Sequence, residues 1–457
     1  MSKIKTYNDL LEIGANEADR MAFIEAAVRE HKASEAYRIA RDAVEYEKQR
    51  NVTINRYRKL LYDLRGNAVE DRFTACHKCA SNFFARFVTQ EASYLLGNGA
   101  NFERDDTKKR LGVDFDMRLY DAGKSALVQG AAYGFYNLDH IEVYELLEFM
   151  PLYDEEDGAI KAGVRFWQLA NDKPMRYTLF ELDGYTDYIR REGKDMEILK
   201  PKRTYKLKVR TSEADGAVIL DGDNYPAFPV VPLWGNKQHQ SELVGMRENI
   251  DCYDLIKSGF ANDLDDASLI YWTLENAGGM GDIDLAQFVE RMKTLKAAAI
   301  DGVKATAHTM DVPHEGREAY LTRLENDLYN DFMALNVTKL AAGNVTATQI
   351  MAAYEPLNNK ADEFEYCLID FIQGILAVAG IEDNVTFTRS PIVNQMEETE
   401  KVLLAASYLD DETLLRKLPW LTPEEVDRIL AERDAEDVRR MLPPPDEEVI
   451  EDEGSGA

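Results

Sequence analysis

The chain has 457 residues, enough for about three structural units at roughly 150 residues each. Hydrophobic residues make up 45% and aromatic residues 10%, so most of the chain can bury a core and is not disordered. Its 54 Lys and Arg stand against 83 Asp and Glu, a net charge of -29. This balance argues against a protein that wraps nucleic acid, because neutralising phosphates needs clustered cations. The net negative charge either serves solubility alone or gives the protein a surface past which DNA moves without binding.

The start of the chain carries no targeting pattern. Its residues, MSKIKTYNDLLEIG, become polar at once, and no apolar run reaches the length of a membrane span. We therefore expect no membrane association and a reducing cytosol as the place of synthesis. There the four cysteines, at positions 76, 79, 252 and 367, would be free thiols.

The first third of the chain is predicted to be mostly helical. Apolar residues recur at helical spacing between residues 6 and 65. Residues 73–96 form an amphipathic helix that Gly97 ends, and residues 115–135 are predicted to be helical too. From about 141 to 233 the pattern changes to short β-branched and aromatic runs, with turn signals at Asp183-Gly184 and Asp221-Gly222. This stretch predicts antiparallel β structure.

Two long helices with a compact insertion between them are predicted next. The first helix runs from about Ser241 to Asp266, and its apolar stripe has steps of three or four. Residues 268–313 are the insertion, and the second helix begins near Pro313 or His314. The two stripes comprise Leu243, Met246, Ile250, Tyr253, Ile256, Phe260 and Leu264 on the first helix, and Leu321, Leu324, Leu328 and Phe332 on the second.

The remaining part is again mainly helical. A small-residue loop at 336–345 precedes a capping box formed by Thr346 and Gln349, which opens a helix that Gly380 ends. Residues 397–441 are predicted to be helical, with a helix start at Thr422-Pro423-Glu424-Glu425. The last residues, 442–457, are rich in proline and acids and are predicted to be disordered.

The apparent motifs for catalysis, cofactors or metals are incomplete. Gly123-Lys124-Ser125 resembles the end of a phosphate-binding loop, but Arg118 stands where the pattern requires glycine, and the segment is predicted to be helical. Cys76 and Cys79 have metal-type spacing without a second ligand pair, so we interpret them as buried thiols of a helix. His140 beside Asp139 has no accompanying nucleophile. The acids at 263, 265 and 266 begin like a calcium loop, but Ser268 replaces its glycine. No catalytic residue, metal or cofactor is predicted.

Several segments, in order along the chain, resemble the phage portal family typified by the portal of the Bacillus phage SPP1. The run FPVVPLWGN at 228–236 is similar to the segment before the family's first stem helix. The helix ending Ala261-Asn262-Asp263-Leu264-Asp265-Asp266 and the later Leu324-Glu325-Asn326-Asp327-Leu328-Tyr329 resemble the family's two stem helices. Upstream, residues 81–97 are similar, and so downstream are Phe387-Thr388-Arg389 with Asn394. The resemblance covers roughly residues 45–410.

The resemblance implies an α+β portal fold made of a wing, a stem, a clip and a crown. The implied parts are the wing of helices and antiparallel β structure (1–240), stem helix 1 (241–267), the α/β clip (268–313), stem helix 2 (314–335), the tunnel loop (336–345), a long wing helix with a return segment (346–396), the helical crown (397–441) and the acidic tail (442–457). Stem packing would use Leu243, Met246, Ile250, Tyr253 and Phe260 of the first stripe and all four residues of the second. The tunnel loop, comprising Val337, Thr338, Lys339, Leu340, Ala341, Ala342, Gly343 and Asn344, would face DNA.

The resemblance also implies partners and a place. The chain would form a homo-oligomeric ring of about twelve at one capsid vertex of the virion, after assembly in the host cytoplasm. Terminase and later a head-completion adaptor would dock on the clip, major capsid and scaffolding proteins would surround the ring, and double-stranded DNA would pass without sequence-specific binding.

Other interpretations stay open. The loop at 336–345 is an ordinary helix–helix connection if it does not touch DNA. A packaging enzyme, either a nuclease or a nucleotide hydrolase, would require a complete phosphate-binding loop or a carboxylate metal cluster. Another head–tail connector would usually be shorter and lack the order of long helix, insertion and long helix.

Overall fold

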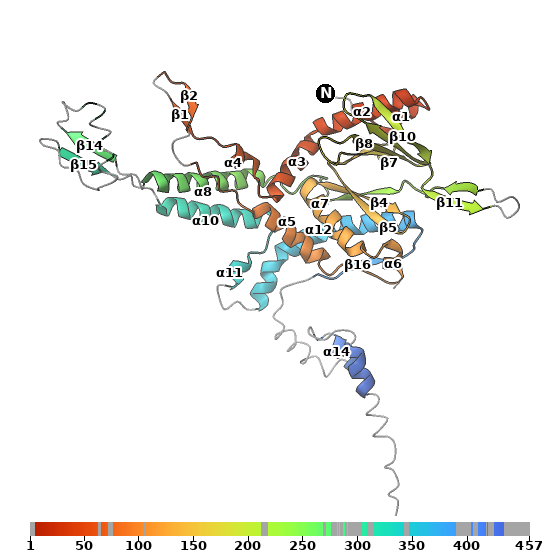
Figure 1. Cartoon of the computed structure of the whole chain (residues 1–457). Coiled ribbons are helices and arrows are strands. Elements are labelled where there is room, and N and C mark those ends of the chain that lie inside the picture. The colour runs from red at the N-terminus through yellow and green to blue at the C-terminus, as the bar shows by residue number, and fades with distance from the viewer. Residues whose placement is uncertain are drawn as a thin grey trace, which may run out of the picture. The chain divides into compact units, whose positions relative to one another are not determined.

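The structure is a computed structural model in which the chain divides into two compact units (Figure 1). The first comprises Met1–Val337 with Tyr354–Ser390, and the second comprises Thr338–Ala353 with Pro391–Ala457. The described residues are 5–62, 65–71, 76–104, 106–211, 218–267, 271–275, 281, 283, 287, 290, 304–308, 314–341, 347–389, 404, 410–416, 418 and 425–433.

A five-stranded antiparallel sheet carries the N-terminal helices. Its strand order is β10-β9-β8-β7-β6, with β6 at Phe149–Tyr153, β7 at Ile160–Trp167, β8 at Met175–Glu181, β9 at Gly184–Arg190 and β10 at Met196–Arg203. Helices α1 (Tyr7–Ile13) and α2 (Glu17–Ala33) pack on this sheet (Figure 1). Helix α1 begins at a capping box in which Thr6 and Asp9 bond each other's backbone N–H. Phe23 and Ile24 of α2 are buried with Leu152, Val164 and Leu179 of the sheet.

The larger core lies around a three-stranded sheet of order β13-β4-β5. The strands are β4 (Ala131–Asn137), β5 (His140–Glu145) and β13 (Val230–Trp234). The helices of this core are α3 (Glu35–Glu47), α5 (Phe83–Leu96), α7 (Phe115–Gln129) and, from Tyr354 onwards, α12 (Ala347–Ala379). Helix α12 can approach the sheet closely because Gly134 and Gly374 lack side chains. A Cβ atom at Gly134 would lie 2.5 Å from the Phe371 ring, and one at Gly374 would lie 2.7 Å from Val231.

Short elements complete the first unit. Two-stranded antiparallel pairs join β1 (Leu60–Tyr62) with β2 (Ala68–Glu70), β3 (Ala100–Phe102) with β16 (Val385–Phe387), β11 (Lys206–Thr211) with β12 (Val218–Asp223), and β14 (Tyr271–Glu275) with β15 (Lys304–His308). Helices α4 (Val52–Arg56) and α6 (Thr107–Leu111) are single turns. The longer helix α8 (Arg247–Ala267) lies near α4, and α10 (His314–Asp331) lies next to α8. The second unit contains α11 (Val337–Ala341, from Thr338 onwards), α14 (Asp411–Arg416) and a helical stretch at 425–433.

The predicted class, mixed α and antiparallel β, is confirmed, but several boundaries were wrong. Helix α5 begins at Phe83, so residues 76–82 are not helical, and α7 ends at Gln129, where β4 follows. The predicted helical region up to 65 includes β1, and Asp221-Gly222 lies within β12 instead of in a turn. The turn at Asp183-Gly184 and the end of α12 at Gly380, whose φ is 67°, are confirmed. Thr346 of the predicted capping box, the Thr422–Glu424 helix start and the tail at 442–457 lie outside the described residues.

Candidate functional site

The helices α8 and α10 pack against each other as neighbours (Figure 1). Leu324, Leu328 and Phe332 are buried, with Phe332 in the turn after α10, and Leu321 is half-buried. Leu243 and Met246 are buried too, but they lie in turns because α8 begins only at Arg247. Gly245, with a φ of 83°, turns the chain just before that helix. Ile250 is fully buried, whereas Tyr253, Ile256 and Phe260 are half-buried and Leu264 is 46% exposed.

The most deeply buried side of α8 beyond Ile250 is polar, which the apolar stripe did not predict. Asp254, Ser258 and Asn262 are each at most 6% exposed and are spaced four apart, so they share one face of the helix. They accept the backbone N–H groups of the extended segment 76–82. The three bonds join Ser81 to Asp254 at 2.8 Å, Cys79 to Ser258 at 2.9 Å and His77 to Asn262 at 2.7 Å.

Asn51 and Thr53 form further hydrogen bonds with α8 and with the segment 76–82. Asn51 Nδ2 donates to both Asp254 and the Ser81 carbonyl, and Thr53 Oγ1 donates to Asp251 at 2.5 Å. Burial raises the pKa of Asp254, although its hydrogen bonds from Asn51 and Ser81 oppose that shift. The regular spacing of three small polar residues in a predicted helix was the signal that could have identified this contact.

The turn that follows α10 is held by a second set of contacts. Gln90 of α5 forms two 3.0 Å hydrogen bonds with the backbone of Leu335, one to its N–H and one to its carbonyl. Lys360 of α12 donates to the Phe332 carbonyl at 3.3 Å, and its ammonium lies 3.1 Å from the centre of the Phe332 ring. Between these anchors Met333 has a φ of 59°, a left-handed conformation that costs a non-glycine residue energy.

Lys360 also connects two carboxylates beneath this turn. Its Nζ lies 2.7 Å from Glu242 and 3.2 Å from Glu91, which is only 1% exposed. Burial raises the pKa of Glu91 to about 8, with Glu242 and Glu363 adding to the shift and Lys360 opposing it. The protonated form of Glu91 is therefore favoured at neutral pH, and Glu242 is the carboxylate nearer to the Lys360 ammonium.

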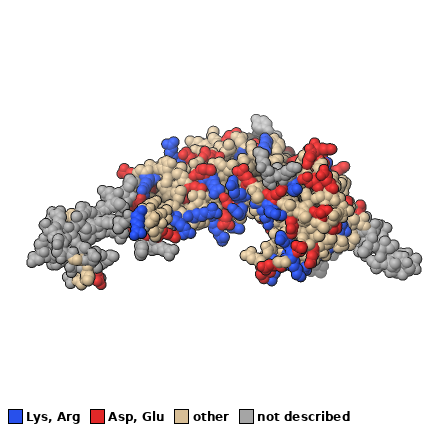
Figure 2. Space-filling view, turned by 90° about the horizontal axis from the view of Figure 1, so that it is seen from above, with Lys and Arg blue, Asp and Glu red and all other residues tan. Residues whose placement is uncertain are grey.

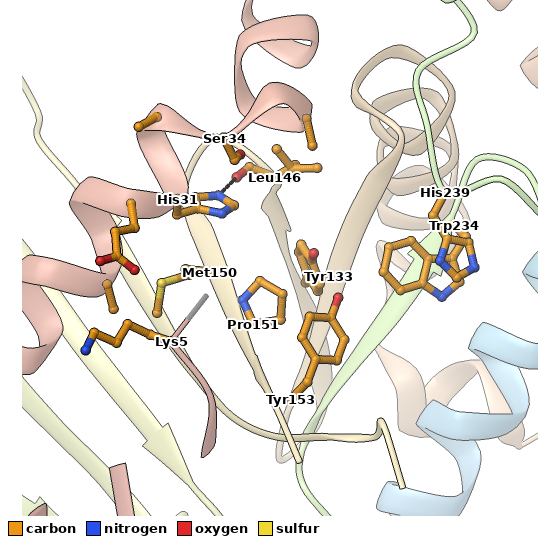
Figure 3. A pocket seen from close by; sticks show the side chains of 14 residues that line it. Lys5, His31, Ser34, Tyr133, Leu146, Met150, Pro151, Tyr153, Trp234 and His239 are labelled. Atoms are coloured by element: carbon orange, nitrogen blue, oxygen red, sulfur yellow. Dashed lines mark hydrogen bonds between the residues drawn. The ribbon is translucent and has the colours of Figure 1, made fainter. Parts of the chain in front are cut away.

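A cavity of about 530 Å³ lies apart from these helices, between α2, α3 and the strands β6 and β13 (Figure 3). His31, Tyr133, Tyr153, Trp234 and His239 are among its lining residues, and Trp234 stacks on His239 with ring centres 3.8 Å apart. The His31 Nε2 lies 2.9 Å from the Leu146 carbonyl, and burial lowers the pKa of this imidazole. One hydrogen bond therefore orients this ring, and burial favours its neutral form.

The motifs discounted from sequence have structural roles. Gly123-Lys124-Ser125 lies within α7, and Lys124 pairs with Glu47 at 2.7 Å. Cys76 and Cys79 are half-buried, not buried as expected, because they lie on the extended segment. His140 and Asp139 form an exposed 2.8 Å pair.

The acidic end of α8 is helical. Asp263 pairs with Arg317 of α10, and Asp265 pairs with His77 at 2.5 Å. Within the described part of the chain, no three His, Cys, Asp or Glu side chains are grouped to hold a metal ion, and no helix is long and apolar enough to cross a membrane.

Comparison with known proteins identifies the family. The family described as "Phage portal protein, SPP1 Gp6-like" matches residues 27–439. The chain belongs to this phage portal family. The portal protein of Clostridium phage phiCD119 is 24% identical over 396 residues, which cover 78% of this chain and 85% of the relative. The portal protein of Bacillus phage SPP1 is 22% identical over 418 residues, covering 81% and 79% respectively.

Solved structures give a looser likeness to this portal family member. A chain in the structure named "Neck of empty GTA particle computed with C6 symmetry" aligns with a TM-score of 0.42 and 11% identity, over 80% of this chain and 91% of that chain. A chain in "Virion of native gene transfer agent (GTA) particle" aligns with a TM-score of 0.40 and 12% identity, over 76% and 89%.

The predicted tunnel loop of this portal family member contains a helix. Residues 337–341 form α11, so the expectation of an irregular loop at 336–345 was wrong for this part. Local backbone hydrogen bonding is the physical reason, because VTKLA includes the good helix formers Lys, Leu and Ala. Val337, Thr338 and Lys339 are exposed and Leu340 is half-buried. Ala342, Gly343 and Asn344 lie outside the described residues, as do the side chain of Ala341 and most of the insertion at 268–313.

Proposed function

We propose that this chain assembles into a closed ring of about twelve copies at one capsid vertex, with a central channel through which double-stranded DNA is packaged and ejected. The observation that carries the proposal is the family match over residues 27–439, which spans both long helices and everything between them. In this proposal α8 and α10 are the stem, the insertion at 268–313 is the clip, and residues 336–345 are the tunnel loop.

The arrangement of the paired helices supports a stem with a docking end. Figure 1 shows the antiparallel pair of β14 and β15 at the end of α8 and α10 that lies away from the sheets. An element at this end can be reached by other proteins while the sheets hold the ring together. We assign the docking of terminase, and later of a head-completion adaptor, to this end. Contacts with major capsid and scaffolding proteins belong to the sheets and the helical residues after 397.

Exposed apolar surface supports side-by-side packing of the helix pairs. Leu264 on α8 and Tyr320 on α10 are each 46% exposed, and Tyr253 and Phe260 are only half-buried within one copy. Apolar side chains left partly open along a helix pair are typical of a surface that neighbouring subunits cover. A heterologous interface of this kind closes into a ring when the rotation between copies fits.

The net charge of α8 and α10 supports a channel that does not bind DNA tightly. Helix α8 has six acidic and two basic residues, and α10 has five and two, so the pair has a net charge of -7 with His314 counted neutral. Figure 2 shows both signs of charge on the face seen from above, with Lys and Arg gathered near the middle. An acidic stem wall repels phosphates, which keeps DNA from binding tightly and allows it to move.

Native mass spectrometry and negative-stain images of one purified sample test the ring. We expect particles of about a dozen subunits with a central hole. If the chain stays monomeric alone, co-expression with the scaffolding protein is expected to produce the ring. A compact dimer that hydrolyses ATP or cuts DNA would overturn the proposal.

A further inference from the structure

Lys360 of α12 contacts the chain both before α8 and after α10. Its ammonium lies 2.7 Å from Glu242, which precedes α8, and it donates to the carbonyl of Phe332, which follows α10. Each of these two connections contains a residue in the left-handed conformation, Gly245 before α8 and Met333 after α10. One side chain of a third helix thus contacts both connections of the helix pair.

The two connections differ in how they are held. Helix α8 is held along its middle by the hydrogen bonds from the segment 76–82. The residues 332–335, here called the α10 turn, form hydrogen bonds with Gln90 of α5 and with Lys360 of α12. Because Met333 within this turn is left-handed, opening of the turn would relieve an unfavourable backbone conformation.

A buried carboxyl group lies beside the same ammonium. Glu91 is 1% exposed, and its Oε2 lies 3.2 Å from the Lys360 Nζ without forming a hydrogen bond among the described residues. The charged groups that face Glu91 are Lys360, Glu242 and Glu363, which are one cation and two carboxylates. Ionised Glu91 would therefore add a negative charge at a place where carboxylates already outnumber cations, and where burial excludes the water that would solvate it.

The side chains that hold the α10 turn are direct neighbours of Glu91. Gln90, which bonds both backbone groups of Leu335, precedes Glu91 on α5, and Lys360 bonds the Phe332 carbonyl. A charge on Glu91 therefore acts next to both anchors of the turn. Release of both anchors would in turn let water reach the Glu91 carboxyl group.

Burial links the proton of Glu91 to the closed form of the turn. The pKa of Glu91 is raised by burial to about 8 in the closed form, against an ordinary value of 4.5. Opening would return this pKa towards 4.5, so the closed form binds more protons than the open form between these two values. The opening equilibrium therefore rises with pH, by up to about tenfold per pH unit between about 5 and 8, and it levels off above about 8.

We propose that Glu91 and Lys360 form a proton-sensitive latch, which keeps the α10 turn closed while Glu91 is protonated. When Glu91 passes its proton to water, the added negative charge favours opening of the turn, because water can then solvate the carboxylate. The rest of the first unit stays folded. The latch does not rest on the ring proposed above, because all of its contacts lie within one copy.

Hydrogen exchange of the full chain, followed by mass spectrometry between about pH 6 and pH 8, tests the latch. The Leu335 amide, which donates to Gln90 at 3.0 Å, reports on the α10 turn. The Phe166 amide, which donates to the Glu148 carbonyl at 2.8 Å, reports on unfolding of the five-stranded sheet. After correction for the intrinsic exchange rate at each pH, the protection of Leu335 is expected to fall at least about tenfold over this range and to stay below that of Phe166.

Three variants test which group carries the proton. Glu91→Gln has a similar shape and no proton to lose, so the protection of Leu335 is expected to stay constant with pH. Glu242→Gln removes a carboxylate that raises the pKa of Glu91, so the fall is expected to end at a lower pH than in the wild type. Glu355→Gln, at an exposed position of α12, is the matched control and should leave the pH profile unchanged.

Two results would overturn the latch. Equal protection of Leu335 and Phe166 at every pH would mean that the turn opens only when the sheet unfolds. The same fall in the wild type and in Glu91→Gln would mean that another group controls the opening. A purely structural role of Glu91 would not shift the end of the fall in Glu242→Gln.

Discussion

Ser258 Oγ on α8 accepts the backbone N–H of Cys79 at 2.9 Å, in the middle of a ladder in which Asp254 and Asn262 do the same for Ser81 and His77. Three side chains of a helix thus replace the neighbouring strand that an extended segment would otherwise need. The ladder fixes the chain between β2 and α5 along the middle of α8.

Removing the middle of the ladder should cost stability. Ser258→Ala leaves the Cys79 N–H without its acceptor at a position where the serine is 1% exposed, so we expect the free energy of unfolding to fall by about 1–2 kcal/mol. Urea denaturation measures the loss, and hydrogen exchange at the Cys79 amide should speed up. Lys257→Ala, at the exposed neighbouring position, is the matched control and should change neither.

The buried Glu91 predicts a pH dependence. Because its folded pKa is raised to about 8 from 4.5, the protonated form is favoured by folding, and this contribution is full below about 4.5 and is lost as the pH rises through about 8. Glu91→Gln keeps a neutral side chain of similar shape. The wild type should therefore lose stability relative to Glu91→Gln between pH 5 and pH 9, by an amount on the order of a few kcal/mol.

Denaturation midpoints of both proteins at several pH values check this point. The difference in stability between the two proteins removes the contributions of other titrating groups to the pH dependence. One of these is His31, whose lowered pKa changes the stability in the opposite direction. Equal slopes for both proteins would show that Glu91 does not titrate in this range.

Glycine at position 134 should be needed for the contact between β4 and α12. A methyl group there would lie 2.5 Å from the Phe371 ring, so Gly134→Ala is expected to lower the free energy of unfolding by about 1–3 kcal/mol. Gly259→Ala in α8 is the control, because no atom lies within 4 Å of the added carbon. That change should raise stability by about 0.5–1 kcal/mol through helix propensity, and calorimetry of the two variants should show opposite shifts.

The left-handed Met333 predicts a stabilising substitution. Its side chain is 46% exposed, so Met333→Gly gives up little packing and relieves a conformation that costs about 1 kcal/mol. A gain of up to about 1 kcal/mol is expected from urea denaturation, since some is lost to the greater freedom of the unfolded chain. Met333→Val, which is branched at Cβ, should instead lose about 1–2 kcal/mol, and a stabilised valine variant would contradict the argument.

Lys339 tests the proposed tunnel loop in the assembled particle. If α11 and the residues after it contact passing DNA, Lys339→Glu should lower the amount of nuclease-protected DNA severalfold, because the added carboxylate repels phosphates. Lys339→Arg keeps the charge and should package normally. Ring formation by both variants must be unchanged, and full packaging by Lys339→Glu would argue for an ordinary connection between helices.

The sequence by itself determined the mixed α and antiparallel β class, the two long helices, the end of α12 at Gly380 and the family, because these depend on local periodicity, capping residues and ordered motifs. Residues 76–82 were predicted to be helical because their local pattern allows it. In the structure they are extended, since Asp254, Ser258 and Asn262 supply hydrogen bonds from a helix about 180 residues away in sequence.

Only the tertiary structure decided what surrounds each polar group. The raised pKa of Glu91 requires burial, with Glu242 and Glu363 from other parts of the chain close by. The strained Met333 persists because Gln90 and Lys360 hold both sides of its turn. The chain on both sides of the β1–β2 pair is likewise bound to α8, through Thr53 and Ser81, which no local pattern reveals. Burial and long-range hydrogen bonding join residues far apart in the chain, and a local reading of the sequence cannot pair them.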